Sequence, residues 1–409
     1  MLKLSNFPIK TLKTRPHISD NISTGILLQA GFIRQTMAGV YNYTTLGLKV
    51  LRNIENVVRE EMDAYGAAEI LMSALSPKEN WEKTGRWDLI DVLFKLPTGS
   101  EGKEYGLNST HEEIVTPLMS EFLTSYKDSG SCVYQIQTKF RNEKRAKSGL
   151  LRGREFIMKD AYSFHIDGGK FDEYYEGMKD VYMKIFDRLG LLSDTYITLA
   201  DGGDFTDKYS HEFQVVLPIG EDNIYICDEC RTSHNEEVID KEKGFKCTNC
   251  SGSNHRIEKA SEVGNIFPLE TKFSKPFGLK MGDKNNKEQD VLMGCYGIGI
   301  SRLMGVIAEY FMGEKGINWP ENIAPADYYI IVIGEGNIEK ATEIAKNLEI
   351  EGKEVILDDR MNKKIGFGQK AGDSELFGIP NRIVVSPKTI EQGGYELLKR
   401  GEKAKIIKF

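Results

Sequence analysis

The sequence predicts a protein of mixed α and β structure with more than one domain, and three observations carry this prediction. Two segments that alternate like strands, 133–143 and 152–164, flank a polar loop. A turn-rich stretch from 224 to about 259 contains four paired cysteines. Beyond a linker at 323–326, short apolar runs alternate with helix-like segments. A chain of 409 residues also exceeds one ordinary core, which suggests two or three domains.

The composition is that of a globular protein outside the membrane. Hydrophobic residues make up 40% and charged residues 28% of the chain. No apolar run approaches the ~20 residues that a membrane helix needs, and Met1–Lys10 is too short and too interrupted for a signal peptide. We therefore expect a cytoplasmic protein without a membrane partner. The net charge of −7 excludes indiscriminate coating of nucleic acid, but it leaves room for a local basic RNA-binding patch.

The first predicted elements are a helix and a strand. From Thr45 to Tyr65 the apolar residues form a helical stripe, and Gly66 fits a stop just past its end. The stretch 68–75 is predicted to be a strand.

The central predicted element is an antiparallel hairpin. In 133–143, Ile136, Thr138 and Phe140 point one way and the intervening polar residues point the other. The basic loop 144–151 would connect this strand to a second extended stretch, 152–164, and 171–189 is predicted to be helical.

The remaining elements follow the cysteine stretch. Residues 290–294 lead into a glycine-rich turn, and a helix is predicted at 301–311. In the last part of the chain, strands and helices alternate, which favours a small α/β domain. The predicted strands there are 328–333, 355–357 and 382–385, and the predicted helix is 338–348.

Two motifs carry a family resemblance. Residues 139–143 (KFRNE) and 152–160 (RGREFIMKD) flank the loop and resemble motif 2 of class II aminoacyl-tRNA synthetases. Residues 293–302 (MGCYGIGISR) resemble motif 3, a glycine-rich strand-to-helix turn that ends in arginine. With the extension AYSFH at 161–165, the chain resembles bacterial-type prolyl-tRNA synthetases along nearly its whole length.

The resemblance implies a fold and a domain order. It implies an α+β class II catalytic domain, in which helices flank an antiparallel sheet, a small zinc-ribbon-like insertion, and a C-terminal α/β anticodon-binding domain. The expected boundaries are 1–223 and 260–322 for the two parts of the catalytic domain, 224–259 for the insertion and 323–409 for the anticodon-binding domain.

The motif residues suit ATP chemistry. On a strand, Arg141 and Glu143 share a face, and an arginine can bind a carboxylate and a phosphate together. The resemblance places Arg141 on the α-phosphate and the amino-acid carboxylate, Glu143 and Phe156 on adenine, and Arg302 near the γ-phosphate. Arg141 and Arg302 are the expected catalytic residues. The expected ATP-binding set is completed by Arg152 and Gly299. The alternative is a surface hairpin with ordinary ion pairs.

Proline requires a different kind of contact, because its ammonium is secondary and has only two N–H donors. Residues 108–113 (NSTHEE) resemble the family element that binds it, with Thr110 and Glu112 as acceptors. The alternative is a helix capping box formed by Thr110 and Glu113. Residues 210–213 (SHEF) resemble a family segment in which the histidine, here His211, lines the proline pocket. Arg141 would bind the proline carboxylate, and Cys295 and Gly297 would shape the far side of the pocket. A lone histidine, however, is more often structural.

The cysteines predict a metal site. Cys227 and Cys230 are separated by sixteen residues from Cys247 and Cys250, which is zinc-ribbon spacing. Four thiolates leave no open catalytic position, so Zn²⁺ would be structural. His234 and His255 are less well spaced as substitutes. The alternatives are a metal-free remnant and a redox pair.

The chain departs from the family pattern in several places. Ser73 stands where motif 1 normally has proline, residues 146–148 (AKS) replace the loop PRF, and Ala371 replaces a phenylalanine. Only about 130 residues separate Asp160 from Gly294, which leaves no room for the large editing domain of many bacterial members. We therefore expect no editing of alanyl-tRNA by this chain, and a separate editing protein as a partner.

The C-terminal region supplies the remaining expectations. Residues 357–360 (LDDR) and 376–380 (LFGIP) resemble the family's anticodon-binding domain, with Arg360 and Lys370 as candidate RNA contacts. A solvated charged face is the alternative. The expected ligands are ATP, Mg²⁺, structural Zn²⁺, L-proline and tRNA(Pro), and a homodimer is expected.

Other functions explain less of the sequence. A threonyl or seryl enzyme shares the class II architecture but not the proline-family segments at 159–165 and 294–299. A catalytically silent paralogue has no reason to keep Arg141, Glu143, Phe156 and Arg302 together. A zinc-dependent nucleic-acid module would explain only the cysteine stretch.

Overall fold

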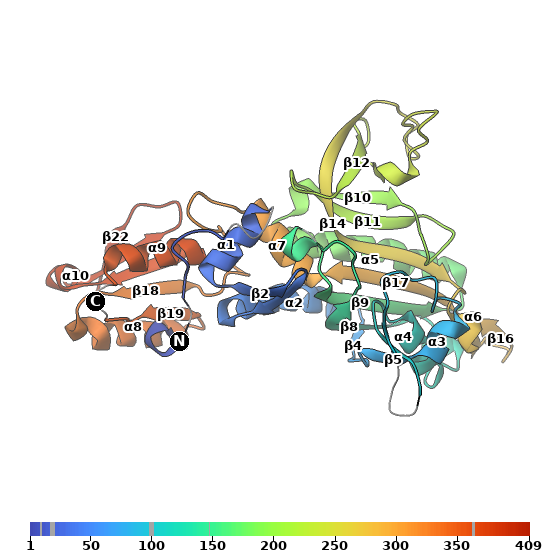
Figure 1. Ribbon diagram of the computed structural model, residues 1–409, viewed down its shortest axis with the longest axis horizontal. Helices are drawn as coiled ribbons and strands as arrows, with labels where there is room; N and C mark the ends of the chain where they lie inside the picture. Colours follow the sequence, from blue (N-terminus) through green and yellow to red (C-terminus); the bar gives the residue numbers. More distant parts are fainter. Residues whose placement is uncertain (9, 17–20, 98–101, 147, 362–364) are drawn as a thin grey trace. The chain divides into compact units, whose positions relative to one another are not determined.

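The computed structural model describes two compact units of the chain (Figure 1). The described residues are 1–8, 10–16, 21–97, 102–146, 148–361 and 365–409. The site unit consists of residues 37–40 and 55–306, and the C-terminal unit consists of 1–36, 41–54 and 307–409. The unit boundaries fall within helices α2 (Thr45–Ala64) and α7 (Ile300–Tyr310). Among the described residues, no helix is long and apolar enough to cross a membrane.

The site unit is built on a nine-stranded sheet with the order β11-β10-β13-β12-β14-β17-β9-β8-β4. All of its pairings are antiparallel except β10–β13 and β4–β8. The strands are β4 (Ala68–Glu69), β8 (Ser131–Phe140), β9 (Glu155–His165), β10 (Thr195–Ala200), β11 (Ser210–Val216), β12 (Asp222–Cys227), β13 (Ser233–Asn235), β14 (His255–Glu270) and β17 (Leu292–Gly299).

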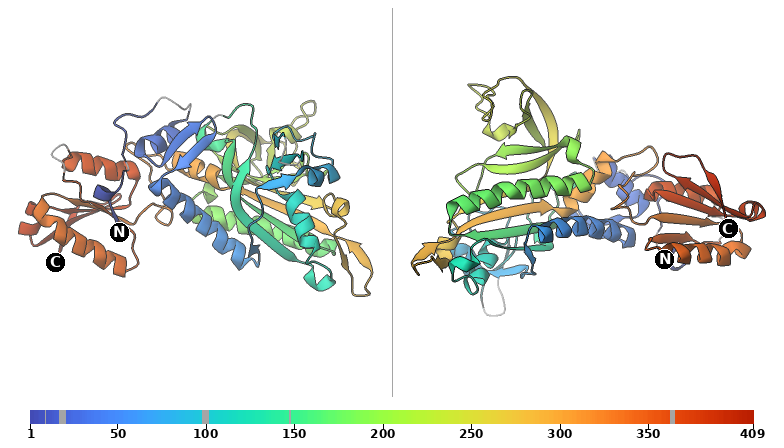
Figure 2. Two further views of the ribbon diagram at one scale, coloured as in Figure 1. Left: turned by 60° about the horizontal axis from the view of Figure 1, so that its bottom comes forward. Right: turned by 180° about the vertical axis from the view of Figure 1, so that it is seen from behind.

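One face of this sheet is covered by helix α5 (Gly168–Arg188), which the right-hand view of Figure 2 shows lying across the strands. The helix begins at Asp167, whose side chain accepts a hydrogen bond from the backbone N–H of Lys170. Side chains alternate between the faces of a strand. Lys159 on β9 contacts Tyr182 of α5, so Met158 and Asp160 lie on the other face. The site is built on that other face.

Shorter elements surround the sheet. They are α3 (Lys78–Lys83), α4 (Glu112–Ser120), α6 (Ser274–Phe277), the three-stranded sheet of β5 (Leu75–Pro77), β6 (Phe94–Leu96) and β7 (Tyr105–Leu107), the hairpin of β15 (Lys280–Gly282) and β16 (Glu288–Asp290), and 3₁₀ turns at Tyr126–Asp128, Gly149–Leu151, Leu192–Asp194 and Glu236–Val238. A buried cluster joins α4 to the sheet and includes Val115, Met119, Phe164, Phe273 and Met293. This core fixes α4, and therefore the chain just before it, against the site face.

The C-terminal unit has a six-stranded sheet in which β1, β19, β18 and β20 are parallel and β21 and β22 are antiparallel. The strands are β1 (Leu2–Lys3), β18 (Tyr328–Val332), β19 (Val355–Asp358), β20 (Asn381–Val385), β21 (Gly394–Lys399) and β22 (Lys405–Lys408). The helices are α1 (Ile22–Ala30), α8 (Ile338–Ile350), α9 (Phe367–Phe377) and α10 (Pro387–Glu391), with 3₁₀ turns at Leu4–Asn6 and Glu335–Asn337. The hairpin of β2 (Ile33–Met37) and β3 (Val40–Tyr43) has its tip, residues 37–40, in the site unit.

Most predicted elements are confirmed. The helix predicted at 45–65 is α2, the hairpin is β8 and β9, the helix at 171–189 is α5, and the helix at 301–311 is α7. The strands and helix predicted after residue 327 are β18, α8, β19 and β20.

Two local predictions are wrong. The strand predicted at 68–75 is broken, because side chains take over part of the pairing with β8. The N–H of Met72 donates to Gln135 Oε1 (3.0 Å), and Gln137 Nε2 donates to the Met72 carbonyl. The glycine-rich turn after Gly294 is instead part of strand β17. Gly294 is required there, since a Cβ would lie 2.2 Å from Tyr296 Oη.

The expected domain boundaries stay a prediction, and the sheet runs across two of them. Strand β12 begins at Asp222, and β14 is continuous from His255 to Glu270. The four-cysteine stretch is therefore built onto one end of the nine-stranded sheet, and β14 also lines the site.

Candidate active site

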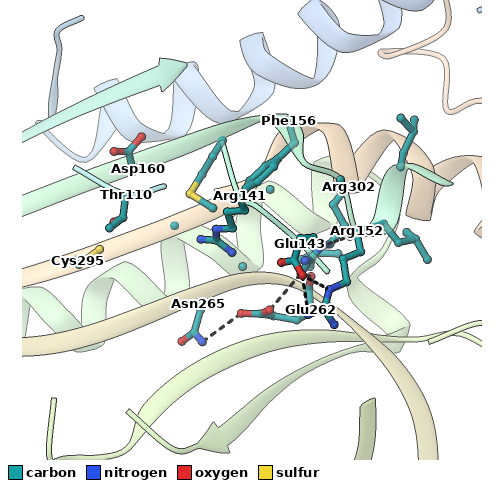
Figure 3. A pocket seen from close by; sticks show the side chains of 18 of the residues that line it. Thr110, Arg141, Glu143, Arg152, Phe156, Asp160, Glu262, Asn265, Cys295 and Arg302 are labelled. Carbon is teal, nitrogen blue, oxygen red and sulfur yellow. Dashed lines mark hydrogen bonds and ion pairs between the residues drawn. The ribbon is translucent and has the colours of Figure 1, made fainter. Parts of the chain in front are cut away.

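A pocket lies on the face of the sheet opposite α5, between β9, β14, β17 and residues 149–153 (Figure 3). Its lining includes Thr110, Arg141, Glu143, Arg152, Phe156, Asp160, Glu262, Asn265, Cys295, Gly297, Gly299 and Arg302. Figure 3 shows Thr110, Asp160 and Cys295 at one end, and Glu143, Arg152, Glu262 and Arg302 at the other. Arg141 lies between these two groups.

Arg141 is the pocket arginine that has no ion-pair partner in the part of the chain that the structure describes. It follows the last residue of β8, and its guanidinium carbon lies 5.2 Å from the centre of the Phe156 ring. Among the described residues, Arg141 has no ion pair within 4 Å. Burial, and then the positive charge of Arg302, lower the pKa of Arg141. An anionic ligand would satisfy this guanidinium, and its planar fork suits a carboxylate or a phosphate.

Arg302 is held more firmly. It lies in the first turn of α7, where Nε donates to the Leu151 carbonyl (2.7 Å). Its Nη1 donates to the backbone carbonyl of Glu262 (2.5 Å) and lies 3.1 Å from Glu262 Oε2. A Cβ at Gly299 would come within 3.2 Å of Arg302 Cβ. The backbone around Arg302 therefore fixes the position of its guanidinium.

Glu143 and Phe156 stand at the same end of the pocket. Arg152 donates from Nε to Glu143 Oε2 (2.9 Å), and Arg154 donates to the Glu143 carbonyl (2.9 Å). The Arg152 contact orients the Glu143 carboxylate, and Phe156 lines the same pocket beside Arg141. A carboxylate that accepts hydrogen bonds and an aromatic face in one pocket suit a purine with an exocyclic amino group.

At the opposite end, Thr110 lines the pocket and Glu112 lies behind it. The Thr110 hydroxyl donates to Glu112 Oε2, and the Cys295 thiol donates to Glu112 Oε1 (3.1 Å). Glu112 is fully buried, and Arg86 Nη1 is 3.7 Å from its Oε2. Burial, followed by the charge of Glu112, raises the pKa of Cys295 well above its usual value, so the thiol stays protonated and can donate.

The capping-box alternative for Thr110 is wrong. Helix α4 begins at Glu112 with His111 as its N-cap, and no side chain caps it. The Thr110 hydroxyl is engaged by Glu112 instead.

The structure does not bring His211 to this pocket. It lies on β11 with Nδ1 2.9 Å from Tyr175 Oη and Nε2 3.2 Å from Lys179 Nζ. Tyr175 also donates to the Ile266 carbonyl (3.0 Å). His211 lines a separate hollow together with Phe171 and Tyr209. Burial lowers its pKa to about 4, so the ring stays neutral and links α5 to β11.

The four paired cysteines come together at the end of the sheet. Their sulfur atoms all lie within 4.8 Å of one another. Cys227 and Cys250 are 3.5 Å apart, as are Cys230 and Cys247. Tetrahedral Zn²⁺ with bonds of about 2.3 Å holds thiolates at comparable separations. His234 Nε2 lies 3.0 Å from Thr248 Oγ1, and the His255 ring packs on Phe245. Neither histidine therefore belongs to the cysteine cluster.

The candidate RNA contacts in the C-terminal unit have structural partners. Lys370 is 1% exposed and donates to the carbonyls of Val332 (2.7 Å) and Asp358 (3.0 Å). The prediction of an RNA contact is wrong for Lys370, because its ammonium is enclosed by the sheet. Arg360 is paired with Asp358 (2.6 Å) and Asp373 (2.8 Å), which neutralise it.

Two departures from the family pattern are clarified by the structure. The carbonyl of Ser73 accepts from Asn108 Nδ2 (2.8 Å) and lies 3.0 Å from His111 Nε2. This role belongs to the backbone and would be the same for proline. In the altered loop, Lys147 lies outside the described residues.

The sequence analysis missed four polar residues of the site. Lys139 and Asp160 stand within the quoted motifs. Each could have been found as a charged residue at a strand position that faces the interior of the protein. Glu262 and Asn265 lie three residues apart on β14, outside any quoted motif, and nothing in the sequence pattern marks them.

Two family models match the chain. Residues 94–311 match the class II tRNA synthetase core domain of the glycine, histidine, proline, serine and threonine group, and residues 327–407 match an anticodon-binding domain. A proline–tRNA ligase of Ehrlichia chaffeensis is 36% identical over 419 residues, which cover 99% of this chain and 97% of that protein. One from Leptospira interrogans is 32% identical over 551 aligned positions, covering 98% of this chain and 94% of that protein.

Solved structures share the fold. The prolyl-tRNA synthetase of Giardia lamblia in complex with prolyl-adenylate aligns with a TM-score of 0.73 and 22% identity, covering 94% of this chain and 73% of that one. The enzyme of Cryptosporidium parvum with L-proline and AMP aligns with a TM-score of 0.74 and 17% identity, covering 97% and 74%.

The sheet, the motif arginines and the matched core define a class II aminoacyl-tRNA synthetase with an anticodon-binding domain. Within that class, the chain belongs to the proline–tRNA ligase family.

Proposed function

We propose that the chain activates L-proline with ATP and transfers the prolyl group to the 3′ end of tRNA(Pro). The observation that carries this proposal is the position of Arg141. Its guanidinium, which has no ion pair with any described residue, lies between a Thr110–Glu112–Cys295 group and a Glu143–Phe156–Arg302 group. An arginine in this place can bind the carboxylate of an amino acid and the α-phosphate of a nucleotide together.

The proline ring would occupy the end of the pocket near Thr110. Its secondary ammonium would donate to the Thr110 hydroxyl, and the Glu112 carboxylate buried behind Thr110 would neutralise the charge. Cys295 donates to Glu112 from the other side and keeps the carboxylate oriented. Gly297 leaves room for the ring, because a Cβ there would meet only Asn265 and Met158 at 3.7 and 3.8 Å.

ATP would occupy the other end. Glu143 would accept from the adenine amino group, Phe156 would stack on the base, and Arg302 would face the outer phosphates. Mg²⁺ fits the same end, since Glu262 and Asn265 offer oxygen ligands. Asn265 Oδ1 is buried and has no hydrogen-bond partner among the described residues. The ion, when bound, would neutralise phosphate charge.

The chemistry then consists of positioning and charge neutralisation. The proline carboxylate attacks the α-phosphorus in line, the bond to the bridging oxygen breaks, and pyrophosphate leaves with the electron pair. Arg141 stabilises the negative charge that gathers on the α-phosphate oxygens. The terminal hydroxyl of tRNA next attacks the adenylate carbonyl and releases AMP. No side-chain nucleophile is needed.

The cysteine cluster would hold one structural Zn²⁺. Two turns of the same kind support this assignment: Arg231 N–H donates to the Cys227 carbonyl and Ser251 N–H donates to the Cys247 carbonyl, each at 2.9 Å. Arg231 and Ser251 both have a φ of 62°. Each turn presents two thiolates to a common centre, and the metal would order a segment that has few apolar residues of its own.

The predictions on editing, tRNA recognition, oligomeric state and location belong to the same proposal. The chain is shorter than the 551 positions over which it aligns with the Leptospira relative, which supports the absence of an editing domain. Recognition of tRNA(Pro) by the anticodon-binding domain, a homodimer, a cytoplasmic location and a separate editing protein stay predictions.

Aminoacylation of tRNA(Pro) with proline and with alanine, side by side, tests the proposal. We expect stable charging with proline, and slow charging with alanine whose product the enzyme does not hydrolyse. Proline-independent pyrophosphate exchange, or exchange that depends on another amino acid, would overturn the assignment of the substrate. Rapid hydrolysis of alanyl-tRNA(Pro) by the purified chain would overturn the absence of editing alone.

A further inference from the structure

Behind the proline end of the pocket, three titratable side chains are enclosed together. Lys139 and His111 are fully buried, and Asp160 is 2% exposed. Lys139 Nζ lies 2.7 Å from Asp160 Oδ1 and 2.6 Å from His111 Nδ1. A buried ammonium and a buried carboxylate each lose their hydration, so they persist only when paired and hydrogen-bonded. A buried ion pair of this kind adds little net stability over well-packed apolar side chains of similar size.

The group closes a ring of contacts around His111. One path runs from Asp160 Oδ1 through Lys139 Nζ to the His111 ring. The second runs from Asp160 Oδ2 to Tyr162 Oη (3.0 Å), which accepts from the backbone N–H of His111 (3.1 Å). Gln135 donates to Asp160 Oδ2 (3.0 Å) and completes the carboxylate's partners. Both the ring and the backbone of His111 are thus fixed by one carboxylate.

The remaining ring nitrogen settles the protonation state of His111. Nε2 lies 3.0 Å from the Ser73 carbonyl, which can only accept, so Nε2 carries the proton. Nδ1 then accepts from the Lys139 ammonium. Burial, and then the charge of Lys139, lower the pKa of His111 to about 4, in agreement with a neutral ring. Burial lowers the pKa of Lys139, and the Asp160 carboxylate that faces it opposes this effect.

His111 separates Thr110 from Glu112, the two residues proposed to bind the proline ammonium. Thr110 precedes it and Glu112 follows it, so the orientation of His111 sets the directions of both side chains. Lys139 precedes Arg141 by two residues near the end of the same strand, and Asp160 lines the pocket. The three side chains therefore tie α4, β8 and β9, which supply the proline site, to one another.

We propose that Lys139, His111 and Asp160 are positioning residues that hold Thr110 and Glu112 in the geometry that binds the secondary ammonium of proline. Lys139 and His111 are enclosed behind the pocket, Asp160 borders its proline end, and the three act through His111. This inference rests on the proposed function, because it takes Thr110 and Glu112 as the residues that bind the proline ammonium. Its expected signature is a loss of proline affinity without a matching loss of ATP affinity.

The test uses pyrophosphate exchange and the KM values for proline and for ATP. For Lys139→Met and for the double variant Lys139→Met/Asp160→Asn, we expect KM for proline to rise at least tenfold and KM for ATP to stay within twofold. The double variant leaves no unpaired buried charge, so it remains measurable where the single variant unfolds. Equal rises in both KM values would overturn the inference.

His111 itself offers a graded comparison. In His111→Asn, the side-chain oxygen stands near the position of Nδ1 and can accept from Lys139, whereas His111→Leu cannot. We expect Asn to recover most of the proline affinity that Leu loses. Equal KM values for proline in these two variants would contradict the proposed contact with Lys139.

Lys159 provides the matched control. It is also fully buried on β9, but it faces α5, where it donates to Tyr182 (2.6 Å) and to the Tyr296 carbonyl (3.0 Å). Lys159→Met should lower the melting temperature and leave KM for proline within twofold. A tenfold rise in this variant would show that any buried lysine has the same effect, and the inference would fail.

Failure of the proposed function is distinguishable from failure of this inference. If Thr110→Val and Glu112→Gln leave KM for proline unchanged, the proline contacts themselves are misassigned. If these two variants raise KM for proline and Lys139→Met does not, only the positioning role is lost.

Discussion

The two ends of the nine-stranded sheet are ordered by different means. At the pocket end, β8, β9 and β17 are backed by a large apolar cluster that includes Phe164, Phe273 and Met293. At the cysteine end, β12 and β13 are followed by turns whose buried cluster, among the described residues, consists of Cys227, Phe245 and Cys247, with Tyr225, Cys230 and Ile239 partly buried against it. The first end can fold from burial of its own side chains. The second buries too little apolar surface to do so, which is why a metal is proposed there.

The two ends therefore differ in what fixes the geometry of their side chains. At the pocket end, Lys139 and Asp160 are buried and paired inside an apolar shell, so their geometry is fixed before a ligand arrives. At the cysteine end, a bound ion would fix the geometry of the thiolates. Strand β14 joins the two ends, since His255 pairs with Cys227 and Asn265 pairs with Gly297.

The largest expected effect is at the pocket end. Arg141→Ala should lower kcat/KM in proline-dependent pyrophosphate exchange by about 10³, roughly 4 kcal/mol of transition-state stabilisation. Because Arg141 has no ion pair within 4 Å among the described residues, its loss should change the melting temperature by less than 2 °C, on the order of the ±0.5 kcal/mol of ordinary surface changes.

Arg141→Lys is its control. Lysine keeps the charge but not the planar fork, so it should restore only part of the activity. Full activity in Arg141→Lys would mean that charge alone matters, and full activity in Arg141→Ala would remove Arg141 from the mechanism.

The next effect concerns the cysteine end. Native protein should contain about one zinc ion per chain, and Cys227→Ser or a strong chelator should melt this end first. Because Glu262 and Asn265 lie further along β14, we expect KM for ATP to rise about tenfold, roughly 1.4 kcal/mol. Metal analysis, limited proteolysis near residues 228–254 and KM values check this.

A metal-free protein with full ATP affinity would contradict both the zinc assignment and the link through β14. Cys132→Ser is a suitable comparison, because that cysteine is buried elsewhere in the sheet and has no role in the cluster.

The sequence predicted those parts of the site that periodicity and spacing encode. The β8–β9 hairpin followed from alternation, and the cysteine set followed from its spacing. Arg141, Glu143, Phe156 and Arg302 were found through a family resemblance, and the structure brings all four to one pocket.

Other features depend on contacts between distant segments, which no local pattern reports. His211 belongs to a sequence segment shared with the family, yet Tyr175 and Lys179 hold it in another hollow. Lysine is usually a surface residue, but the ammonium of Lys370 is buried and donates to two backbone carbonyls. The broken strand at 68–75 depends on the glutamines of β8, because their side chains replace backbone partners.

A smaller effect is expected at two glycines of β17, where substitution should change different KM values. A Cβ at Gly297 would meet no atom closer than 3.7 Å, so Gly297→Ala should fold normally and place a methyl group in the proline end of the pocket. We expect KM for proline to rise about fivefold, roughly 1 kcal/mol, with KM for ATP unchanged. At Gly299 the Cβ would press on Arg302 at 3.2 Å, so Gly299→Ala should affect KM for ATP instead. Identical KM patterns in the two variants would contradict the division of the pocket into two ends.

A further effect lies between the two ends of the sheet. Glu212 on β11 accepts from Asn235 (2.9 Å) on one side, and Asn265 lies 3.5 Å away on the other. Burial, and then the charge of Glu262, raise the pKa of Glu212 from 4.5 to about 8. Between these pH values the folded chain holds a proton that the unfolded chain releases. The contribution of Glu212 to stability is therefore complete below pH 4.5 and is lost as the pH rises through 8.

Glu212→Gln should remove this dependence. Relative to the unchanged chain, the variant should gain stability between pH 6 and pH 8, by at most about 1.4 kcal/mol per pH unit, or a few degrees in melting temperature. Melting curves at pH 6, 7 and 8 measure it, and parallel curves for the two proteins would show that Glu212 does not titrate in this range. If the gain at pH 8 disappears when zinc is removed, the carboxyl group couples to the cysteine end. If it persists, its coupling runs to the pocket through Asn265.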